Sequence, residues 1–112
     1  MFNDVKVPKE NRIGEDGFGF KFAMKSLSGG RIGIASQALG IAAGAYELAK
    51  EYSKDRKAFG KTISNHQAIQ FKLADMATEI DAARLLVHRA ATLKDQGKDY
   101  TLEGSMAKLF AS

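Results

Sequence analysis

The sequence predicts an all-α fold, in which two long helices and a shorter third one form part of an up-and-down bundle after a short extended N-terminal segment. Two long runs of apolar residues repeat at alternating steps of three and four, as on the buried face of a helix. The single proline is Pro8, so no proline interrupts a helix after it. A chain of 112 residues is enough for one small domain or part of one.

Residues 1–15 are expected to differ from the rest of the chain. Val5 and Val7 lie on one face at a period of two and Pro8 ends the run, which indicates a short strand. One strand is not stable alone, so this strand would need partners outside the chain. We therefore expect an extended remnant of a sheet with its linker at residues 1–15, and an incomplete helical bundle at residues 16–112.

The first long helix is expected between Ile32 and Gly60, after one or two helical turns at Phe20–Leu27 and an interruption at Ser28–Gly30. It has two apolar stripes side by side, so it is expected to be covered on more than one side. One stripe comprises Ile34, Ala38, Ile41, Ala45, Leu48 and Tyr52, and the other comprises Ile32, Ala35, Leu39, Ala42, Tyr46 and Ala49. The glycines of this helix, at 33, 40 and 44, are expected to let neighbouring backbones approach closely.

The second long helix is expected from Ser64, where Ser64 and Gln67 have the spacing of a capping box, to a left-handed cap at Gly97. A third helix is expected to begin at Thr101 as its N-cap and to continue to the last residue without a stop signal, as if the chain were cut within it. The apolar stripe of the second helix comprises Ile69, Leu73, Met76, Ile80, Ala83, Val87 and Ala90.

Composition excludes several classes of function. The chain has no cysteine, which excludes disulfides, thiol chemistry and thiolate metal sites. Its 17 Lys and Arg against 13 Asp and Glu give a net charge of +4, which favours anionic ligands but is too weak to require nucleic acid. Neither a secretory signal nor a membrane span is expected, because the apolar Ile32–Ala49 stretch is mostly Ala and Gly and also carries Ser36, Gln37 and Glu47.

The turn between the two long helices carries four cations around one aromatic residue, namely Lys54, Arg56, Lys57, Lys61 and Phe59. Such a group can clamp a phosphate or pyrophosphate, with Phe59 along an adenine ring. The alternative is a solvated helix end whose cations suit the helix dipole, and spacing alone favours that alternative.

Other polar residues give weaker signals. His66 and His88 have no partners at metal-ligand spacing, so no metal site is expected. Two glycine-containing segments, at residues 17–19 and 28–31, lack the full pattern of a phosphate-binding loop. Arg31 is an isolated cation at the start of a very apolar helix, and such a charge is expected to be paired or to face a ligand cleft. No pair of carboxylates suggests general acid–base catalysis.

Taken together, these segments resemble an acyl-CoA dehydrogenase over essentially the whole chain, most closely the short-chain, butyryl-CoA-type branch. The Arg-x-x-Phe-Gly element at 56–60, followed by Leu-Ala-Asp-Met at 73–76, is the most specific part of the resemblance. The other matching segments are Val5–Asn11, Gly30–Ala35, Gln70–Leu73 and Ala107–Leu109.

The resemblance implies that residues 1–15 end a β domain and that the helices are the first part of a C-terminal four-helix bundle. It also implies that four residues contact the FAD of a neighbouring subunit. Arg56 would lie at the pyrophosphate, Phe59 and Gln67 would lie towards the adenine, and His66 would contact the same FAD. It implies that Leu27, Ser28 and Arg31 line the acyl-CoA cleft. It further implies a homo-oligomer that uses electron-transfer flavoprotein as partner, in the bacterial cytoplasm or the mitochondrial matrix.

The chain also departs from the family pattern. Some relatives have a hydroxyl residue at Ala58 that helps to hold the flavin phosphate, and an acid at Ser28. The family's base is a glutamate, usually well downstream of residue 112 and in some branches at the position of Gly30. The 112 residues are therefore expected to be a fragment of a flavin-dependent dehydrogenase with no catalytic residue of their own, inactive alone and without tight FAD retention.

Two other functions remain open at this point. The chain could be a free-standing helical interaction module without catalytic activity, whose wide apolar faces are buried by self-association. It could also bind nucleic acid through the basic turn, but most of its aromatic residues lie at core spacing, so this alternative ranks last. In either the fragment or the module, self-association is expected.

Overall fold

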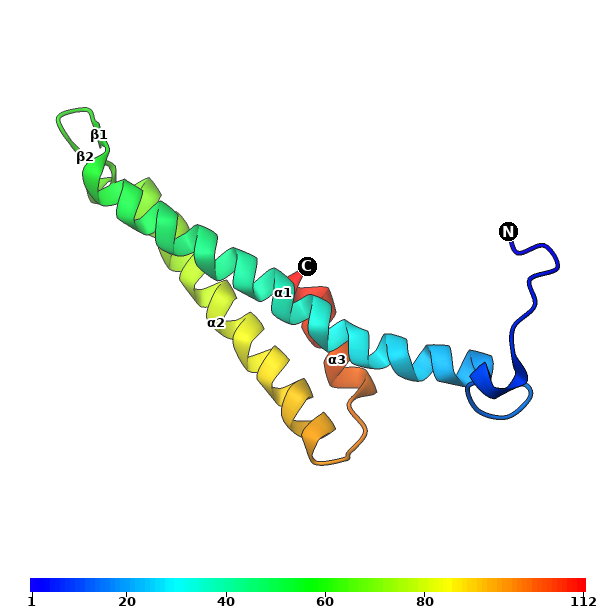
Figure 1. Cartoon of the computed structure of the whole chain (residues 1–112). Helices are drawn as coiled ribbons and strands as arrows, with labels where there is room; N and C mark the ends of the chain where they lie inside the picture. Colours follow the sequence, from blue (N-terminus) through cyan, green and yellow to red (C-terminus); the bar gives the residue numbers. More distant parts are fainter.

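The computed structural model describes residues 1–112 and confirms the all-α fold class. Three helices account for most of the chain, and a two-stranded hairpin joins the first two (Figure 1). In chain order the elements are η1 (Lys9–Asn11), α1 (Gly19–Asp55), β1 (Lys57–Ala58), β2 (Lys61–Thr62), η2 (Ile63–Asn65), α2 (Gln67–Asp95) and α3 (Thr101–Ala111).

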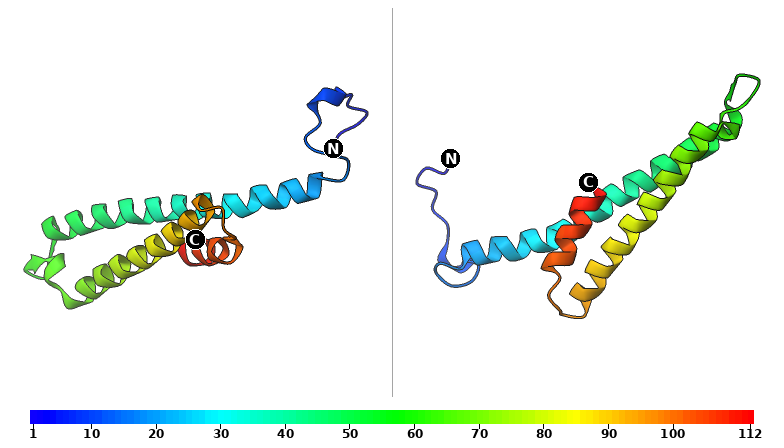
Figure 2. Two further views of the ribbon diagram at one scale, coloured as in Figure 1. Left: turned by 90° about the horizontal axis from the view of Figure 1, so that it is seen from below. Right: turned by 180° about the vertical axis from the view of Figure 1, so that it is seen from behind.

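The helices form a long, thin assembly. Helices α1 and α2 run antiparallel from the hairpin and diverge along their length, and α3 folds back against both of them (Figures 1 and 2). The principal extents are 72 × 35 × 16 Å, and the radius of gyration is 21.6 Å. A compact chain of this size would have a radius of gyration of about 13 Å. The three helices thus form an elongated assembly rather than a compact domain.

Helix α1 is continuous over 37 residues, so the interruption predicted at Ser28–Gly30 is wrong. Each glycine costs a helix about 1 kcal/mol relative to alanine, which weakens a helix without ending it. Tertiary contacts offset that cost here, because Ile32 and Ala35 directly after the glycines are buried against the other helices.

The end of α1 also differs from the prediction. The helix stops at Asp55 rather than at Gly60, and Arg56 follows in an extended conformation. Residues 57–62 form an antiparallel hairpin in which Lys57 pairs with Thr62 and Ala58 with Lys61. The sequence did not indicate these strands, because each is only two residues long and has no alternating apolar pattern.

Only one of the two stripes of α1 is covered by the other helices. Ile32 and Ala35 of the second stripe are buried, and the rest of this stripe faces the side of α2 and α3. The first stripe remains open to solvent, with Ile41 67% and Leu48 76% exposed. The predicted stripe of α2 is confirmed, since all seven of its residues are buried or half-buried. The wide apolar arc of α1 therefore has a cover on one side only.

The core lies where the three helices meet. Its buried residues are Ile32, Ala35, Val87, Ala90 and Ala107, with contributions from α1, α2 and α3. Three of these five side chains are alanines, so the helices approach closely but enclose little hydrocarbon. Only 8 of 112 residues are buried, and no large side chain is fully enclosed. The core holds the three helices together at one place and leaves their outer parts uncovered.

Helix α2 starts by a different mechanism from the one predicted. The N-cap is His66, and no side chain caps the helix, so the capping box of Ser64 and Gln67 does not form. Ser64 lies in the 3₁₀ turn η2 instead, where its hydroxyl is 3.1 Å from the Thr62 hydroxyl. The Asn65 amide donates to the same Thr62 oxygen at 2.8 Å. These bonds tie the turn to the hairpin rather than to the helix.

Helix α3 begins at Thr101, but Thr101 is its first helical residue and not its N-cap, which is Tyr100, and no side chain caps the helix. The carboxylate of Asp99 accepts a 3.0 Å hydrogen bond from the Thr101 backbone N–H. This bond to the charged form lowers the pKa of Asp99 below its ordinary value. At the other end of the same turn, Gly97 has a φ of 68°, as predicted for a left-handed C-terminal cap.

The N-terminal segment makes little contact with the helices. The strand predicted around Val5 and Val7 is not formed, and both side chains are exposed. The first element is instead the 3₁₀ turn η1. Arg12 then bonds Asp16 at 2.7 Å in the connector that leads into α1. Figure 1 shows this segment beyond the free end of α1.

Helix α1 also has the length and mean hydropathy of a membrane-crossing helix, a property that it shares with core helices of soluble proteins. The alanine, isoleucine and leucine residues of the helix raise its mean hydropathy to this value. Its Ile32 and Ala35 face α2 and α3, as expected for a helix that packs against protein.

The three glycines predicted to permit close approach along α1 have no such contact within this chain. A Cβ atom added at Gly33, Gly40 or Gly44 would meet nothing within 4 Å, so these glycines do not permit any close approach between elements of this chain. The close approach occurs at Gly104 of α3, where an added Cβ would lie 3.7 Å from Ile32 Cγ1 and 3.9 Å from the Ser28 carbonyl oxygen. Helix α3 therefore crosses α1 with a glycine at the contact.

We predict that Gly104→Ala stabilises the chain and that Gly104→Leu destabilises it. The alanine methyl would make ordinary van der Waals contacts and improve helix propensity, together a gain of about 0.5–1 kcal/mol in the free energy of unfolding. Thermal unfolding followed by circular dichroism measures both variants. Gly40→Ala is the matched control, since its methyl would lie in open space. A loss of stability in Gly104→Ala, alongside a gain in Gly40→Ala, would contradict the spacing described between α1 and α3.

Candidate functional site

The predicted site residues form two groups on α1 and beyond its C-terminal end. Leu27, Ser28 and Arg31 lie in the N-terminal half of α1, whereas Arg56 follows its last turn. At 1.5 Å per residue, Arg31 and Arg56 are separated by about 38 Å along the helix. Phe59, His66 and Gln67 lie with Arg56 at the hairpin end. One ligand-binding site therefore cannot contain both groups unless the ligand itself is long.

The hairpin end is built around a two-residue loop. Phe59 and Gly60 connect the paired residues Ala58 and Lys61, with φ angles of 53° and 81°. Positive φ at both central residues is typical of the tight hairpin turn whose twist matches that of the strands. The loop projects beyond the ends of α1 and α2 (Figure 1), and Phe59 at its tip is 97% exposed.

His66, the N-cap of α2, contacts this loop. Its Nε2 lies 3.0 Å from the carbonyl oxygen of Ala58, so the protonated nitrogen donates to the base of the loop. Its ring lies edge-on to Phe59, with the ring centroids 6.1 Å apart at 82°. Gln67, the first residue of α2, follows directly and is exposed. The four residues predicted to contact a flavin thus lie together at one end of the molecule.

Three of the four cations in the turn are free to meet an anion. Lys54 donates to Glu51 at 2.6 Å, which raises the pKa of Lys54 and lowers that of Glu51. The exposed side chains of Arg56, Lys57 and Lys61 form no salt bridge. The i,i+3 spacing of Glu51 and Lys54 near the end of a helix predicts this pair from the sequence, and the structure confirms it.

The backbone fixes Arg56 at the base of the hairpin. Its N–H donates to the Tyr52 carbonyl at 3.0 Å, and its own carbonyl accepts from the Ile63 N–H at 2.8 Å. These bonds join the last turn of α1 to the start of η2. The guanidinium is therefore attached to a well-supported backbone while its side chain stays in solvent.

The other predicted group lies near the junction of the three helices. Arg31 is exposed and donates to the Ser105 hydroxyl at 3.4 Å, a long contact. Ser28 is half-buried and its carbonyl lies near Gly104, while Leu27 is exposed. We expected Arg31 to be paired or to face a ligand cleft. Within this chain its guanidinium forms no salt bridge, and its one hydrogen bond is this long contact with Ser105 of α3.

Two further polar groups, which the sequence did not indicate, lie beside the N-terminal half of α1 near Ser28 and Arg31. A Cβ atom at Gly29 would lie 3.5 Å from the Nζ of Lys94 and 3.8 Å from the hydroxyl oxygen of Tyr100. Lys94 is in the last turn of α2 and Tyr100 directly precedes α3. No local motif marks these residues, because only the return of α2 and α3 to the N-terminal half of α1 places them there.

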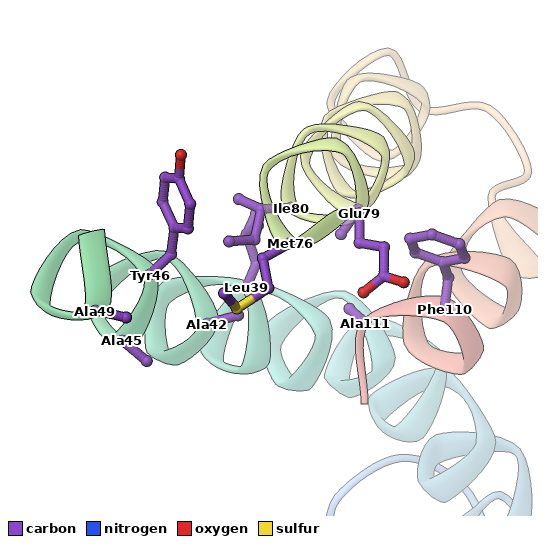
Figure 3. Close-up of a pocket in the computed structure, with 11 residues that line it drawn as sticks. Leu39, Ala42, Ala45, Tyr46, Ala49, Met76, Glu79, Ile80, Phe110 and Ala111 are labelled. Atoms are coloured by element: carbon purple, nitrogen blue, oxygen red, sulfur yellow. The ribbon is translucent and has the colours of Figure 1, made fainter. Parts of the chain in front are cut away.

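An apolar groove runs between the helices (Figure 3). It has a volume of about 590 Å³, and Glu79 is its only lining residue that is not hydrophobic. Tyr46 and Phe110 lie on opposite sides of Ile80 and Met76 in this view. The lining residues are Leu39, Ala42, Ala45, Tyr46, Ala49, Met76, Glu79, Ile80, Ala83, Phe110 and Ala111. A groove of this composition suits the apolar face of a helix and offers no acid–base chemistry.

Neither group of predicted site residues contains a carboxylate. The chain contains no group of three His, Cys, Asp or Glu side chains placed to hold a metal ion. The segment around Ser28 and Arg31 holds no carboxylate, and Gly30 stands directly before the arginine. What the arrangement offers is one cationic surface with an aromatic tip, one polar patch at the helix junction, and an apolar groove.

Comparisons with known proteins give a consistent result. Residues 17–112 match the family described as the acyl-CoA dehydrogenase C-terminal domain. The chain is 56% identical to the caffeyl-CoA reductase–Etf complex subunit CarC of Acetobacterium woodii and 56% identical to the short-chain specific acyl-CoA dehydrogenase of Megasphaera elsdenii. Both alignments cover all of this chain, but only 30% and 29% of the respective relatives. The chain thus spans about a third of the length of the curated relatives it matches.

Solved structures agree with the sequence comparison. A chain in a structure of the electron transferring flavoprotein of Acidaminococcus fermentans is 58% identical, with a TM-score of 0.96 over 99% of this chain and 29% of that one. Butyryl-CoA dehydrogenase from M. elsdenii is 56% identical, with a TM-score of 0.95 over 98% of this chain and 29% of that one. The three-helix arrangement therefore recurs within larger proteins. On this evidence the chain belongs to the acyl-CoA dehydrogenase family, with residues 17–112 in its C-terminal helical domain.

Proposed function

We propose that this chain is the cofactor-contacting and substrate-contacting helical part of a flavin-dependent short-chain acyl-CoA dehydrogenase. The observation that carries the proposal is the hairpin end, where three unpaired cations lie within a few residues of an exposed aromatic residue. Pyrophosphate and adenine, two parts of FAD, are suited to contact with these two kinds of group. The family assignment implies that a bound flavin would supply a hydride acceptor for the acyl-CoA, while the residues of the hairpin end would hold its pyrophosphate and adenine parts.

At the hairpin end, Arg56 would hold the pyrophosphate and Phe59 the adenine side of FAD. Gln67 and His66 would complete the contact from the start of α2, where His66 already supports the loop through Ala58. Because this end lies about 38 Å from Arg31 along α1, we assign its flavin to a neighbouring subunit. The exposed loop extends beyond the ends of both helices, so it could contact another subunit without displacing either helix.

At the other end, Leu27, Ser28 and Arg31 would line the acyl-CoA cleft. Lys94 and Tyr100 lie beside Gly29 and would add a cation and a hydroxyl donor to that cleft. This segment has no carboxylate, so it would bind and orient the acyl-CoA, while the base that removes the α-proton would come from a part of the protein outside these residues.

The partners follow from the family in the same way. One relative is named as a subunit of a complex with Etf, and one solved structure concerns an electron transferring flavoprotein, which supports such a flavoprotein as the electron acceptor. The open apolar faces of the helices support a homo-oligomer. Relatives include bacterial and mitochondrial proteins, so either the cytoplasm or the mitochondrial matrix fits as location.

A second candidate function is a self-associating helical interaction module without catalytic activity. The apolar groove of about 590 Å³ favours it, because such a groove attracts an amphipathic helix whether or not a cofactor is bound elsewhere. The two functions make different predictions about the cations of the hairpin. These cations are essential for a flavin site and dispensable for a module held together through the groove.

The first test concerns the charge at the hairpin. In the complete protein that carries this chain, Arg56→Gln is expected to weaken FAD binding about ten- to a hundredfold, because a charge-assisted contact to the pyrophosphate is lost. Flavin fluorescence during titration measures the affinity. Lys98→Gln is the matched control, since Lys98 is an exposed cation in the turn after α2. Equal FAD affinity in both variants and the unchanged protein would contradict the flavin assignment.

The second test concerns the 112 residues by themselves. We expect the purified chain to retain no FAD and to leave butyryl-CoA unchanged, because its flavin-side residues lie on a convex, exposed surface and its cleft segment has no base. Absorbance in the flavin region and an assay with an artificial electron acceptor measure the two properties. A yellow protein that bleaches on addition of acyl-CoA would overturn this expectation.

The third test concerns assembly of the same purified chain. Its open apolar faces are larger than those a soluble monomer normally exposes, so we expect a dimer or a higher oligomer, with residues 31–55 and 69–93 packing across chains. Light scattering after size exclusion measures the mass. Substitution of the exposed Ile41 by Lys should shift the equilibrium toward the monomer, whereas Lys98→Glu, in the turn after α2 and outside both packing segments, should not. A monomer of 12.1 kDa at all concentrations would count against the prediction.

A further inference from the structure

The outer face of α2 carries an apolar stripe whose large side chains no part of this chain covers. Phe71 and Leu85 on this face are 61% and 65% exposed, whereas the opposite face of α2 packs against α1 and α3. Ala74, Thr78 and Ala82 lie on the same side of the helix, because the five residues follow one another at steps of three or four. These five residues form what we call the outer stripe.

The outer stripe is symmetrical about Thr78. Its steps are three, four, four and three, so Phe71 and Leu85 each lie seven residues, or about 10 Å, from Thr78. The residues between the two ends are small, and the Thr78 hydroxyl donates to the carbonyl oxygen of Ala74 in its own helix at 2.9 Å. Another helix can therefore approach the middle of the stripe closely. Because the stripe has the same spacing in both directions, it can pair with a copy of itself in antiparallel orientation.

The two ends of the outer stripe complement each other. Phe71 at one end is an exposed ring without an aromatic contact in this chain. Next to Leu85 at the other end, a shallow apolar pocket of about 370 Å³ opens between α2 and α3. The pocket is lined by Leu86, Met106, Leu109 and Phe110. In an antiparallel pair, the phenyl ring of one copy would lie beside Leu85 of the other copy, at the entrance of this pocket.

We propose that the outer stripe is a contact between two copies of this chain, in which α2 of one copy packs antiparallel to α2 of the second, with a two-fold axis beside Thr78. The inference rests on the proposed function, which requires a neighbouring subunit at the hairpin end. It goes beyond that function by naming the surface and the orientation that hold this subunit. Phe71 of each copy packs against Leu85 of the other, so the axis generates the same contact twice.

The antiparallel orientation agrees with the position of the hairpin. A pair centred on Thr78 brings Gln67 of one copy level with Arg89 of the second. The hairpin of each copy then lies beside the three-helix junction of the other copy. A parallel pair would instead place the two hairpins side by side, where their unpaired cations would repel each other.

The outer stripe forms the centre of a larger interface. It is about 21 Å long, and contact along one helix of this length buries less than the roughly 800 Å² per partner of a stable protein interface. The exposed hairpins supply further area, because each extends beyond the helix ends towards the second copy. The groove of about 590 Å³ is lined by Met76, Ile80 and Ala83 of α2, on the opposite face of the helix, so this pairing leaves the groove free.

An exchange of charge tests the pairing in the complete protein that carries this chain. Phe71→Lys and Leu85→Glu would each bury an unpaired charge in the contact, and each alone is expected to raise the dissociation constant of the copies at least about tenfold. The double variant would bring opposite charges together across the axis twice, and it is expected to recover most of this loss. Sedimentation over a range of concentrations measures the dissociation constant. Lys98→Glu is the control, since Lys98 is exposed and lies beyond the end of α2.

A cross-link at the axis gives a second measurement. This chain contains no cysteine, and Thr78→Cys would place two thiols next to each other on the axis. We expect this variant to form a disulfide-linked dimer on mild oxidation and Lys98→Cys to form none. The unsubstituted complete protein is oxidised beside them, as the reference for any cysteine outside these residues.

Each departure from this pattern contradicts a stated part of the proposal. Unchanged assembly in Phe71→Lys and Leu85→Glu would overturn the contact. A lower unfolding midpoint at unchanged mass would also overturn it, because another part of the same polypeptide would then cover the outer stripe. Weaker assembly in both single variants, without recovery in the double variant and without the Thr78→Cys cross-link, would overturn the antiparallel orientation.

The same set of variants separates this contact from the flavin site. FAD affinity is measured in Arg56→Gln beside the assembly variants. If Arg56→Gln weakens FAD binding while the outer-stripe variants assemble normally, the subunit contact is wrong and the flavin site stands. If Arg56→Gln binds FAD with unchanged affinity, the proposed function is wrong, whatever the mass of the outer-stripe variants.

Discussion

Close contact between small side chains at the junction of α1, α2 and α3 is the constraint on which the rest of the structure depends. Ala35, Ala90 and Ala107 are completely buried there, and Gly104 brings α3 close to the backbone of α1. Because these side chains are short, the helices approach closely but enclose little hydrocarbon. This one contact places Tyr100 and Lys94 beside Gly29, and it orients α2 so that the hairpin lies at the far end of the molecule.

Because few side chains are buried at this junction, most of the apolar surface of the helices stays uncovered. A stable soluble domain of this length normally has a radius of gyration of about 13 Å, against the observed 21.6 Å. The exposed stripe of α1 and the groove between the helices are suited to contact with further helical surfaces. The same arrangement of helices matches 29% of a longer chain in a solved relative. Gly33, Gly40 and Gly44, which touch nothing in this chain, lie on this open helix. The helical layer is thus organised around contacts beyond its own residues.

The two candidate ligand surfaces differ in how they are built. The hairpin end is local, because Arg56, Phe59 and His66 are close in sequence and a tight turn brings them together. Its chemistry was therefore visible as a cluster of cations around one aromatic residue. The polar patch near Ser28 is assembled from all three helices, and only Ser28 and Arg31 were suggested by the sequence. Lys94 and Tyr100 are distant along the chain and join the patch through tertiary packing.

The sequence by itself determined that this protein is helical, which face of α2 is buried, where the two long helices are separated, and which family it resembles. Periodic apolar residues and local motifs carry this information, because both act over a few residues. Tertiary structure alone decided that α1 runs unbroken through Ser28–Gly30, which of its two stripes is covered, and that Gly104 rather than Gly40 is the point of close approach. Such outcomes depend on the balance between weak local preferences of about 1 kcal/mol per residue and packing between distant segments, and the second of these terms has no local signature.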